Sequence, residues 1–183
     1  MIDLKLLNKK SIGIIGVRGI GRIYLRELSF LGVKKIFILG KNFKNSLKYK
    51  QSYEKELKLK ILPCKSIKDL KSKKLDIVCI CSPTNTHLKY IKSFLLTKTK
   101  LIVEKPLFWE NNLSLKKAYK INELLFKKYP NKFLTNLPLL EFSKNFKEKF
   151  SINKTKIKKI NFKYYTSGNN LYKNIAVDLL PHA

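Results

Sequence analysis

Residues 11–21 read Ser-Ile-Gly-Ile-Ile-Gly-Val-Arg-Gly-Ile-Gly, a short apolar run that passes into closely spaced glycines. The run Ser11–Ile15 has the length and composition of a buried strand. Apolar residues then recur at helical spacing: Ile20, Tyr24, Leu28 and Leu31. Gly32 follows them as a helix stop signal. The stretch therefore predicts a strand, a glycine turn and a helix, in that order.

This glycine turn fits the phosphate-binding turn of a dinucleotide fold. Glycines there permit a tight turn, close approach of the backbone to a pyrophosphate, and close packing of helix on strand. Gly16 and Gly21 fit the first and third positions of the G-x-G-x-x-G pattern, and Gly19 lies between them. Arg18 stands at the second position, where its side chain either crowds the pyrophosphate or swings out to contact a phosphate. A tight turn without a ligand is the alternative.

Strand-like and helical patterns alternate over the rest of the first 137 residues. Expected strands are Ile36–Leu39, Leu59–Leu62, Leu75–Cys81, Leu101–Val103 and Lys132–Thr135. Expected helices are Ser66–Lys71, Thr84–Leu96 and Leu113–Lys128, whereas Lys41–Glu56 is polar and poorly defined. Short connections between alternating elements predict an α/β fold, a Rossmann-type doubly wound parallel sheet with helices on both faces.

The pattern changes after about residue 137. Glu141–Phe150 looks helical and very basic, Ile157–Tyr165 looks like a strand, and residues 167–170 form a turn. We therefore expect residues 1–137 to form the Rossmann domain. Residues 138–183 would be the beginning of a second, incomplete α/β domain, because one strand has no sheet to join.

The cofactor preference is predicted from the residues after the second expected strand. An Asp or Glu there would bind the adenosine ribose hydroxyls and disfavour a 2′-phosphate. This sequence has Gly40-Lys41-Asn42 instead, and a lysine suits a 2′-phosphate better. We therefore expect NADP to be preferred over NAD.

The charge of the chain is extreme, with 40 Lys and Arg against 12 Asp and Glu and a net charge of +28. Such a balance often marks binding to nucleic acid or to an anionic membrane. Only three of the basic residues are arginines, and the lysines are scattered, which is typical of a bias toward A/T-rich codons. We expect no specific nucleic acid partner. Charge-driven binding to polyanions is a reserve hypothesis, which a steep salt dependence would reveal.

No apolar run approaches the ~18 residues of a membrane-spanning helix, and the N-terminus lacks the features of a signal peptide. These observations favour a cytoplasmic protein without membrane contact. Cys64, Cys79 and Cys81 are expected to be reduced and buried, the last two on opposite faces of one strand. The spacing of Cys and His predicts no metal site.

Three further motifs complete a family pattern. They are Cys-Ser-Pro-Thr-Asn-Thr-His at residues 81–87, Val-Glu-Lys-Pro at 103–106 and Asp-Leu-Leu-Pro-His at 178–182. With the glycine turn, they resemble the Gfo/Idh/MocA family of NAD(P)-dependent oxidoreductases over nearly the whole chain. The resemblance implies a Rossmann cofactor domain, then an α/β domain that forms the substrate pocket and often the oligomer interface.

The resemblance also implies the site residues. Lys105 would lie near nicotinamide and substrate, and Asp178 and His182 would complete the catalytic set. The expected cofactor-binding residues are Gly16, Arg18, Gly19, Gly21, Lys41, Ser82, Pro83, Asn85, Glu104 and Lys105. A histidine can take the hydroxyl proton because its pKa lies near neutrality, and a lysine can stabilise developing negative charge. His87 is interpreted as a helix-start or packing residue.

The implied function is hydride transfer to or from a sugar-like, cyclitol or nucleotide-sugar substrate, by a homo-oligomer or a chain that lacks a partner domain. Family members continue well beyond the Asp-x-x-x-His motif. The alternative is therefore a non-catalytic truncated remnant, or a dinucleotide-binding module that needs a partner chain.

Overall fold

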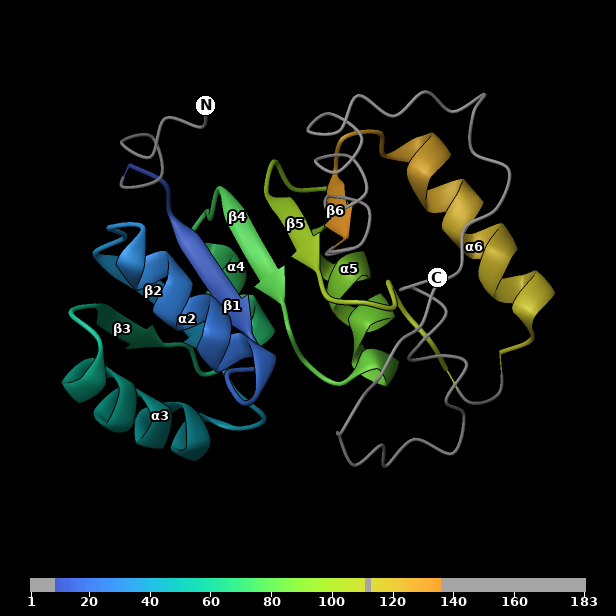
Figure 1. Ribbon diagram of the computed structural model, residues 1–183. Helices are drawn as coiled ribbons and strands as arrows, with labels where there is room; N and C mark the ends of the chain where they lie inside the picture. Colours follow the sequence, from blue (N-terminus) through green and yellow to red (C-terminus); the bar gives the residue numbers. More distant parts are fainter. Residues whose placement is uncertain (1–8, 111–112, 136–183) are drawn as a thin grey trace, which may run out of the picture. The chain divides into compact units, whose positions relative to one another are not determined.

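The computed structural model describes residues 9–110 and 113–135. They contain one parallel sheet in the order β3-β2-β1-β4-β5-β6 (Figure 1). The strands are β1 (Ile12–Ile15), β2 (Lys35–Leu39), β3 (Lys60–Pro63), β4 (Ile77–Ile80), β5 (Lys100–Val103) and β6 (Phe133–Thr135). The direction of chain progress reverses between β1 and β4, and open α/β sheets bind their ligands at such a switch point.

The helices divide between the two faces of the sheet. They are α2 (Ile20–Phe30), α3 (Phe43–Glu56), α4 (Ile67–Ser72), the 3₁₀ turn η1 (Thr84–Thr86), α5 (His87–Phe94) and α6 (Leu115–Lys128). Right-handed crossovers place helices on opposite faces when the chain moves in opposite directions along the sheet. Accordingly, Leu25 of α2 and Tyr53 of α3 share one core cluster, whereas Leu70 of α4, Ile91 of α5 and Leu125 of α6 share another. The expectation of a doubly wound Rossmann-type sheet is confirmed.

The central strand β1 supplies both core layers. All of its residues are buried, as a sheet covered on both faces requires. Ile12 and Ile14 belong to the cluster under α2 and α3, and Ile15 belongs to the cluster under α4, α5 and α6. Successive side chains of a strand point to opposite faces, so this alternation follows from the strand geometry.

The same geometry corrects one expectation about the cysteines. Cys79 and Cys81 are both buried, as expected, but they lie in the same core cluster with Ile14. Residues two apart in a strand share a face, and Ile80 between them faces the other cluster. The prediction of opposite faces was therefore wrong.

The polar stretch that the sequence left undefined forms a helix of 14 residues, α3. Its first turn is capped by Asn42, whose Oδ1 accepts a hydrogen bond from the Asn45 backbone N–H at 2.8 Å. Tyr49 and Tyr53 stack with ring centroids 5.7 Å apart and supply its packing face. The expected helix Thr84–Leu96 also differs, because its first residues form η1 before α5 begins.

Several expectations fall outside the described residues: the helix Glu141–Phe150, the strand Ile157–Tyr165, the turn at residues 167–170, and Asp178 and His182. The domain boundary near residue 137 stays a prediction for the same reason. Within residues 9–110 and 113–135, no helix combines the length and the apolar character needed to cross a bilayer.

We predict that all three cysteines react slowly with thiol reagents in the native protein. Burial raises the pKa of Cys64 to about 11 and the pKa of Cys79 to about 12, and it also raises the pKa of Cys81. The thiolate is the reactive form, so little of it is present near pH 8. Titration with a chromogenic disulfide should detect the thiols only after unfolding in urea. One fast-reacting thiol in the native protein would contradict the described packing.

Candidate functional site

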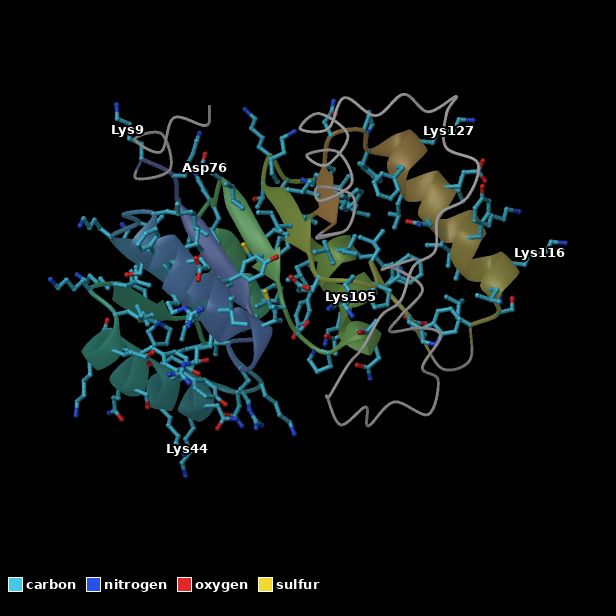
Figure 2. The ribbon with its side chains drawn as sticks, viewed as in Figure 1. Lys9, Lys44, Asp76, Lys105, Lys116 and Lys127 are labelled. Carbon is cyan, nitrogen blue, oxygen red and sulfur yellow. The ribbon has the colours of Figure 1, made fainter. Side chains whose placement is uncertain are left out.

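The segments expected to bind a cofactor lie at one edge of the sheet. The carboxyl ends of parallel strands meet at the same edge. Gly16 follows β1, Lys41 follows β2, Ser82 follows β4 and Lys105 follows β5. Figure 2 shows Lys105 just beyond the end of β5. The fold therefore gathers residues that are far apart in the sequence along one edge.

Gly16 brings the glycine turn against the segment after β4. It has φ +85°, and a Cβ there would lie 2.6 Å from the backbone N and Cα of Ser82. Its N–H donates to the Leu39 carbonyl at the end of β2, at 2.9 Å. The turn is thus held between the carboxyl ends of β2 and β4, and only glycine fits.

The other two glycines of the turn have different roles. A Cβ on Gly21 would overlap the carbonyl of Gly16, so this glycine allows α2 to begin close to β1. Gly19 has φ +49°, and a Cβ there would meet nothing within 4 Å. The open glycine is therefore Gly19, one residue after the pattern position that Arg18 occupies.

The space beside Gly19 suits a phosphate group. It lies at the N-terminus of α2, which has no acidic residue in its first turn. The first N–H groups of a helix lack intrahelical partners, and the helix dipole favours an anion there. The glycine turn, which contains Gly16, Gly19 and Gly21, therefore has space and backbone donors suited to the pyrophosphate of a dinucleotide.

The loop after β2 presents Lys41 and no carboxylate. Lys41 is exposed. The neighbouring polar groups are engaged within the loop, since the Gly40 N–H donates to Ser46 Oγ at 2.9 Å and Asn42 caps α3. Among residues 40–42, Lys41 is the group available to an incoming phosphate.

The segment after β4 has both engaged and exposed groups. Thr86 Oγ1 donates to the Pro83 carbonyl at 2.6 Å, so it accepts from Ser82 Oγ across 2.7 Å. Pro83 and Asn85 are exposed at the same sheet edge. Pro83 and Asn85 thus remain accessible to a ligand, whereas the Ser82 hydroxyl holds η1 in place.

His87 joins two of the motif segments. It is 1% exposed, and its Nε2 lies 2.7 Å from the Ser82 carbonyl oxygen. Its Nδ1 lies 3.1 Å and 3.2 Å from the carbonyl oxygens of Pro106 and Leu107. Carbonyl oxygens only accept, so His87 bonds these segments only as a donor, and its ring lies between the two segments. The interpretation as a helix-start or packing residue is confirmed, but no local pattern in the sequence indicates this connection.

Glu104 is also more buried than its expected role implies. It is 8% exposed, and Tyr24 Oη of α2 donates to its Oε1 at 2.6 Å. Burial, the hydrogen bond and the carboxylate charge raise the pKa of Tyr24 well above its usual value. Glu104 therefore fixes the segment carrying Lys105 to α2, the helix that the glycine turn begins. Lys105 itself is half-buried.

The structure thus places Gly16 against Ser82, and His87 links Ser82 to the segment after β5. Tyr24 links Glu104 to α2. The links through His87 and Tyr24 were missed by the sequence analysis. Within the described ranges, no group of three or more His, Cys, Asp or Glu residues is placed to hold a metal ion. Asp178 and His182 lie outside those ranges.

Comparison with known proteins identifies the family. A family model described as an oxidoreductase family with an NAD-binding Rossmann fold, GFO_IDH_MocA, matches residues 10–129. The chain belongs to this family. Its Rossmann sheet is accordingly the family's NAD-binding fold. No curated protein matches the sequence.

Solved structures of several dehydrogenases share the fold. A myo-inositol dehydrogenase from Lactobacillus casei in complex with NAD(H) and myo-inositol is 19% identical, with a TM-score of 0.59 over 78% of this chain and 41% of that one. A scyllo-inositol dehydrogenase from the same organism is 20% identical (TM-score 0.55, 78% and 42%). A UDP-N-acetylglucosamine 3-dehydrogenase from Acidithiobacillus ferrooxidans is 18% identical (TM-score 0.52, 74% and 42%). This chain therefore spans about two fifths of their length.

We predict that Tyr24→Phe lowers the free energy of unfolding by about 1.5 to 3 kcal/mol, because a hydrogen bond to a buried carboxylate is lost. Urea denaturation measures the change. Tyr119→Phe is the matched control, since Tyr119 is 72% exposed. Equal stability of the two variants would show that the Tyr24–Glu104 bond contributes nothing.

His87→Leu should lower the free energy of unfolding by about 2 to 4 kcal/mol, because backbone carbonyls on two segments lose their shared donor. The same denaturation experiment applies, with Lys89→Leu on the exposed side of α5 as the control. An unchanged unfolding midpoint for His87→Leu would exclude a structural link through this residue.

Proposed function

We propose that this chain is an NAD(P)-dependent oxidoreductase that transfers a hydride to or from a sugar-like, cyclitol or nucleotide-sugar substrate. The close approach of the glycine turn to the Ser82 segment at the switch point carries the proposal. This is the place where an open α/β sheet holds a dinucleotide. Residues 1–137 would form the cofactor domain and residues 138–183 would begin the substrate domain.

The substrate class is supported by the solved structures of similar fold. Their names describe dehydrogenases of inositols and of a UDP-linked sugar, and two of them contain NAD(H) and an inositol. All of these substrates are rich in secondary hydroxyl groups. A secondary alcohol and its ketone are the pair that a nicotinamide cofactor interconverts.

The residues of the chain supply position and electrostatics in this proposal. Gly16, Gly19 and Gly21 frame the pyrophosphate at the start of α2, and Pro83 and Asn85 line the cofactor across the switch point. Lys105 orients the reacting oxygen and stabilises the negative charge that develops on it. Glu104 and Tyr24 hold the Lys105 segment in place.

The proton of the substrate hydroxyl goes to His182 in this proposal. Asp178 would lie beside it, since residues four apart on a helix share a face. Both residues come from the family motif alone. Lys105→Met and His182→Asn should each abolish most of the turnover, and His182→Asn should leave cofactor binding intact.

We predict saturable one-to-one binding of NADPH and NADH that survives moderately high salt, with NADPH the tighter because Lys41 replaces an acidic residue. Calorimetry of the purified chain at two salt concentrations measures both affinities. Two concentrations are needed because a charge of +28 attracts any polyphosphate.

Binding that disappears with salt would contradict the dinucleotide site. Equal affinity for the two cofactors would contradict the role of Lys41. Tight cofactor binding without oxidation of any inositol, sugar or nucleotide sugar would favour the second function, a dinucleotide-binding module that works with a partner chain.

A further inference from the structure

All three arginines of the chain line a single cleft between α2 and α3, with a volume of about 490 Å³. We call it the arginine cleft. It is lined by Arg18, Gly19, Arg22, Ile23, Arg26, Tyr49, Tyr53 and Glu56. Every other basic residue is a lysine, and Lys9, Lys44, Lys116 and Lys127 in Figure 2 show how widely the lysines are spread. The planar fork of arginine suits phosphate and carboxylate groups better than an ammonium does.

Two of these arginines are engaged by acidic residues. Arg22 Nη2 lies 2.9 Å and 2.7 Å from the carboxylate oxygens of Glu56, and its guanidinium lies 5.5 Å from the centre of the Tyr53 ring. Arg26 is paired with Glu27 at 3.3 Å. The charge of Glu56 is therefore compensated, and it does not oppose an anion entering the cleft.

Arg18 differs from the other two. Its side chain is exposed, and its guanidinium forms no hydrogen bond or ion pair with any residue of the ranges 9–110 and 113–135. It lines the same cleft as Tyr53. Its positive charge acts to lower the pKa of that phenol, although burial raises the pKa on balance. Arg18 is thus the cation of the cleft that no acidic side chain compensates.

The backbone that carries Arg18 is held in place. Tyr53 Oη donates to the Val17 carbonyl at 3.2 Å, which ties the turn to α3. On the other side, the Gly16 N–H donates to the Leu39 carbonyl at the end of β2. Arg18 therefore projects from a fixed turn beside the strand end where the adenosine ribose is recognised in this fold.

We propose that the Arg18 guanidinium binds the adenosine 2′-phosphate of NADP(H), with Lys41 as a second cation, and so determines the cofactor preference. This inference rests on the proposed function, and it names the residue that distinguishes the two cofactors. A phosphate accepts two parallel hydrogen bonds from a guanidinium, and one carboxylate in its place would repel it. The loop after β2 has no carboxylate, so nothing there favours an unphosphorylated ribose.

The test uses two probes that differ only in the 2′-phosphate: adenosine 2′,5′-bisphosphate and adenosine 5′-monophosphate. Calorimetry at low and at moderately high salt compares the full chain with Arg18→Ala, Arg18→Lys and Arg26→Ala. Arg18→Ala should weaken binding of the bisphosphate about tenfold or more and change binding of the monophosphate less than about twofold. Arg18→Lys should fall between the wild type and Arg18→Ala.

Arg26→Ala is the matched control, since it removes the same charge from the same cleft. Bisphosphate affinity that falls equally in Arg18→Ala and Arg26→Ala would overturn the proposal in favour of general electrostatic attraction. Unchanged bisphosphate affinity in Arg18→Ala would overturn it outright. If the wild type binds neither the monophosphate nor NADH at the higher salt, the proposed function fails together with this inference. If the wild type binds NADH normally and Arg18→Ala keeps the wild-type preference for the bisphosphate over the monophosphate, only the assignment of Arg18 fails.

Discussion

The arrangement of the site depends on one close contact, between the backbone of Gly16 and the backbone of Ser82. No residue with a Cβ can stand at position 16 without separating the ends of β1 and β4. Because the two strands are neighbours across the switch point, their separation would also displace His87, which holds Ser82 to the segment after β5. The absence of one methyl-sized group thus sets the spacing of three segments.

The buried His87 and the partly buried Tyr24 then hold the neighbouring segments in position. His87 connects the carboxyl ends of β4 and β5, and Tyr24 connects α2 to Glu104. These hydrogen bonds are shielded at least in part from water, and in such surroundings a polar group that loses its partner is costly. The hydrogen bonds of His87 and Tyr24 hold the motif segments in defined positions relative to the glycine turn. A surface loop without such bonds would have no defined position.

The sequence predicted the sheet well because its strands are short apolar runs that few other structures accommodate, as in the run that became β4. It failed on α3, where Tyr49 and Tyr53 are the main packing residues and a serine is fully buried, so no apolar pattern emerges. It placed Arg18 at the second position of the glycine pattern, and the structure shows that the glycine with open space beside it is the next residue, Gly19. The Tyr24–Glu104 bond spans 80 residues of sequence, and only the order of the strands brings its ends together. The local spacing of apolar residues carries no information about contacts between residues so far apart in the sequence. From the sequence, Tyr24 is therefore placed only on the apolar face of a helix.

The division of the core into two clusters has a consequence for how this fold can diverge. The glycine turn, Arg18 and the loop after β2 belong to elements packed in the cluster under α2 and α3, whereas α5 and the segment at Leu107 pack in the other cluster. Substitutions that change nucleotide recognition can therefore accumulate in the cluster under α2 and α3. They need not alter the packing of the cluster under α4, α5 and α6. The Tyr24–Glu104 bond ties the segment that carries Lys105 to α2. Substitutions at these two residues would therefore affect nucleotide recognition and the chemistry together.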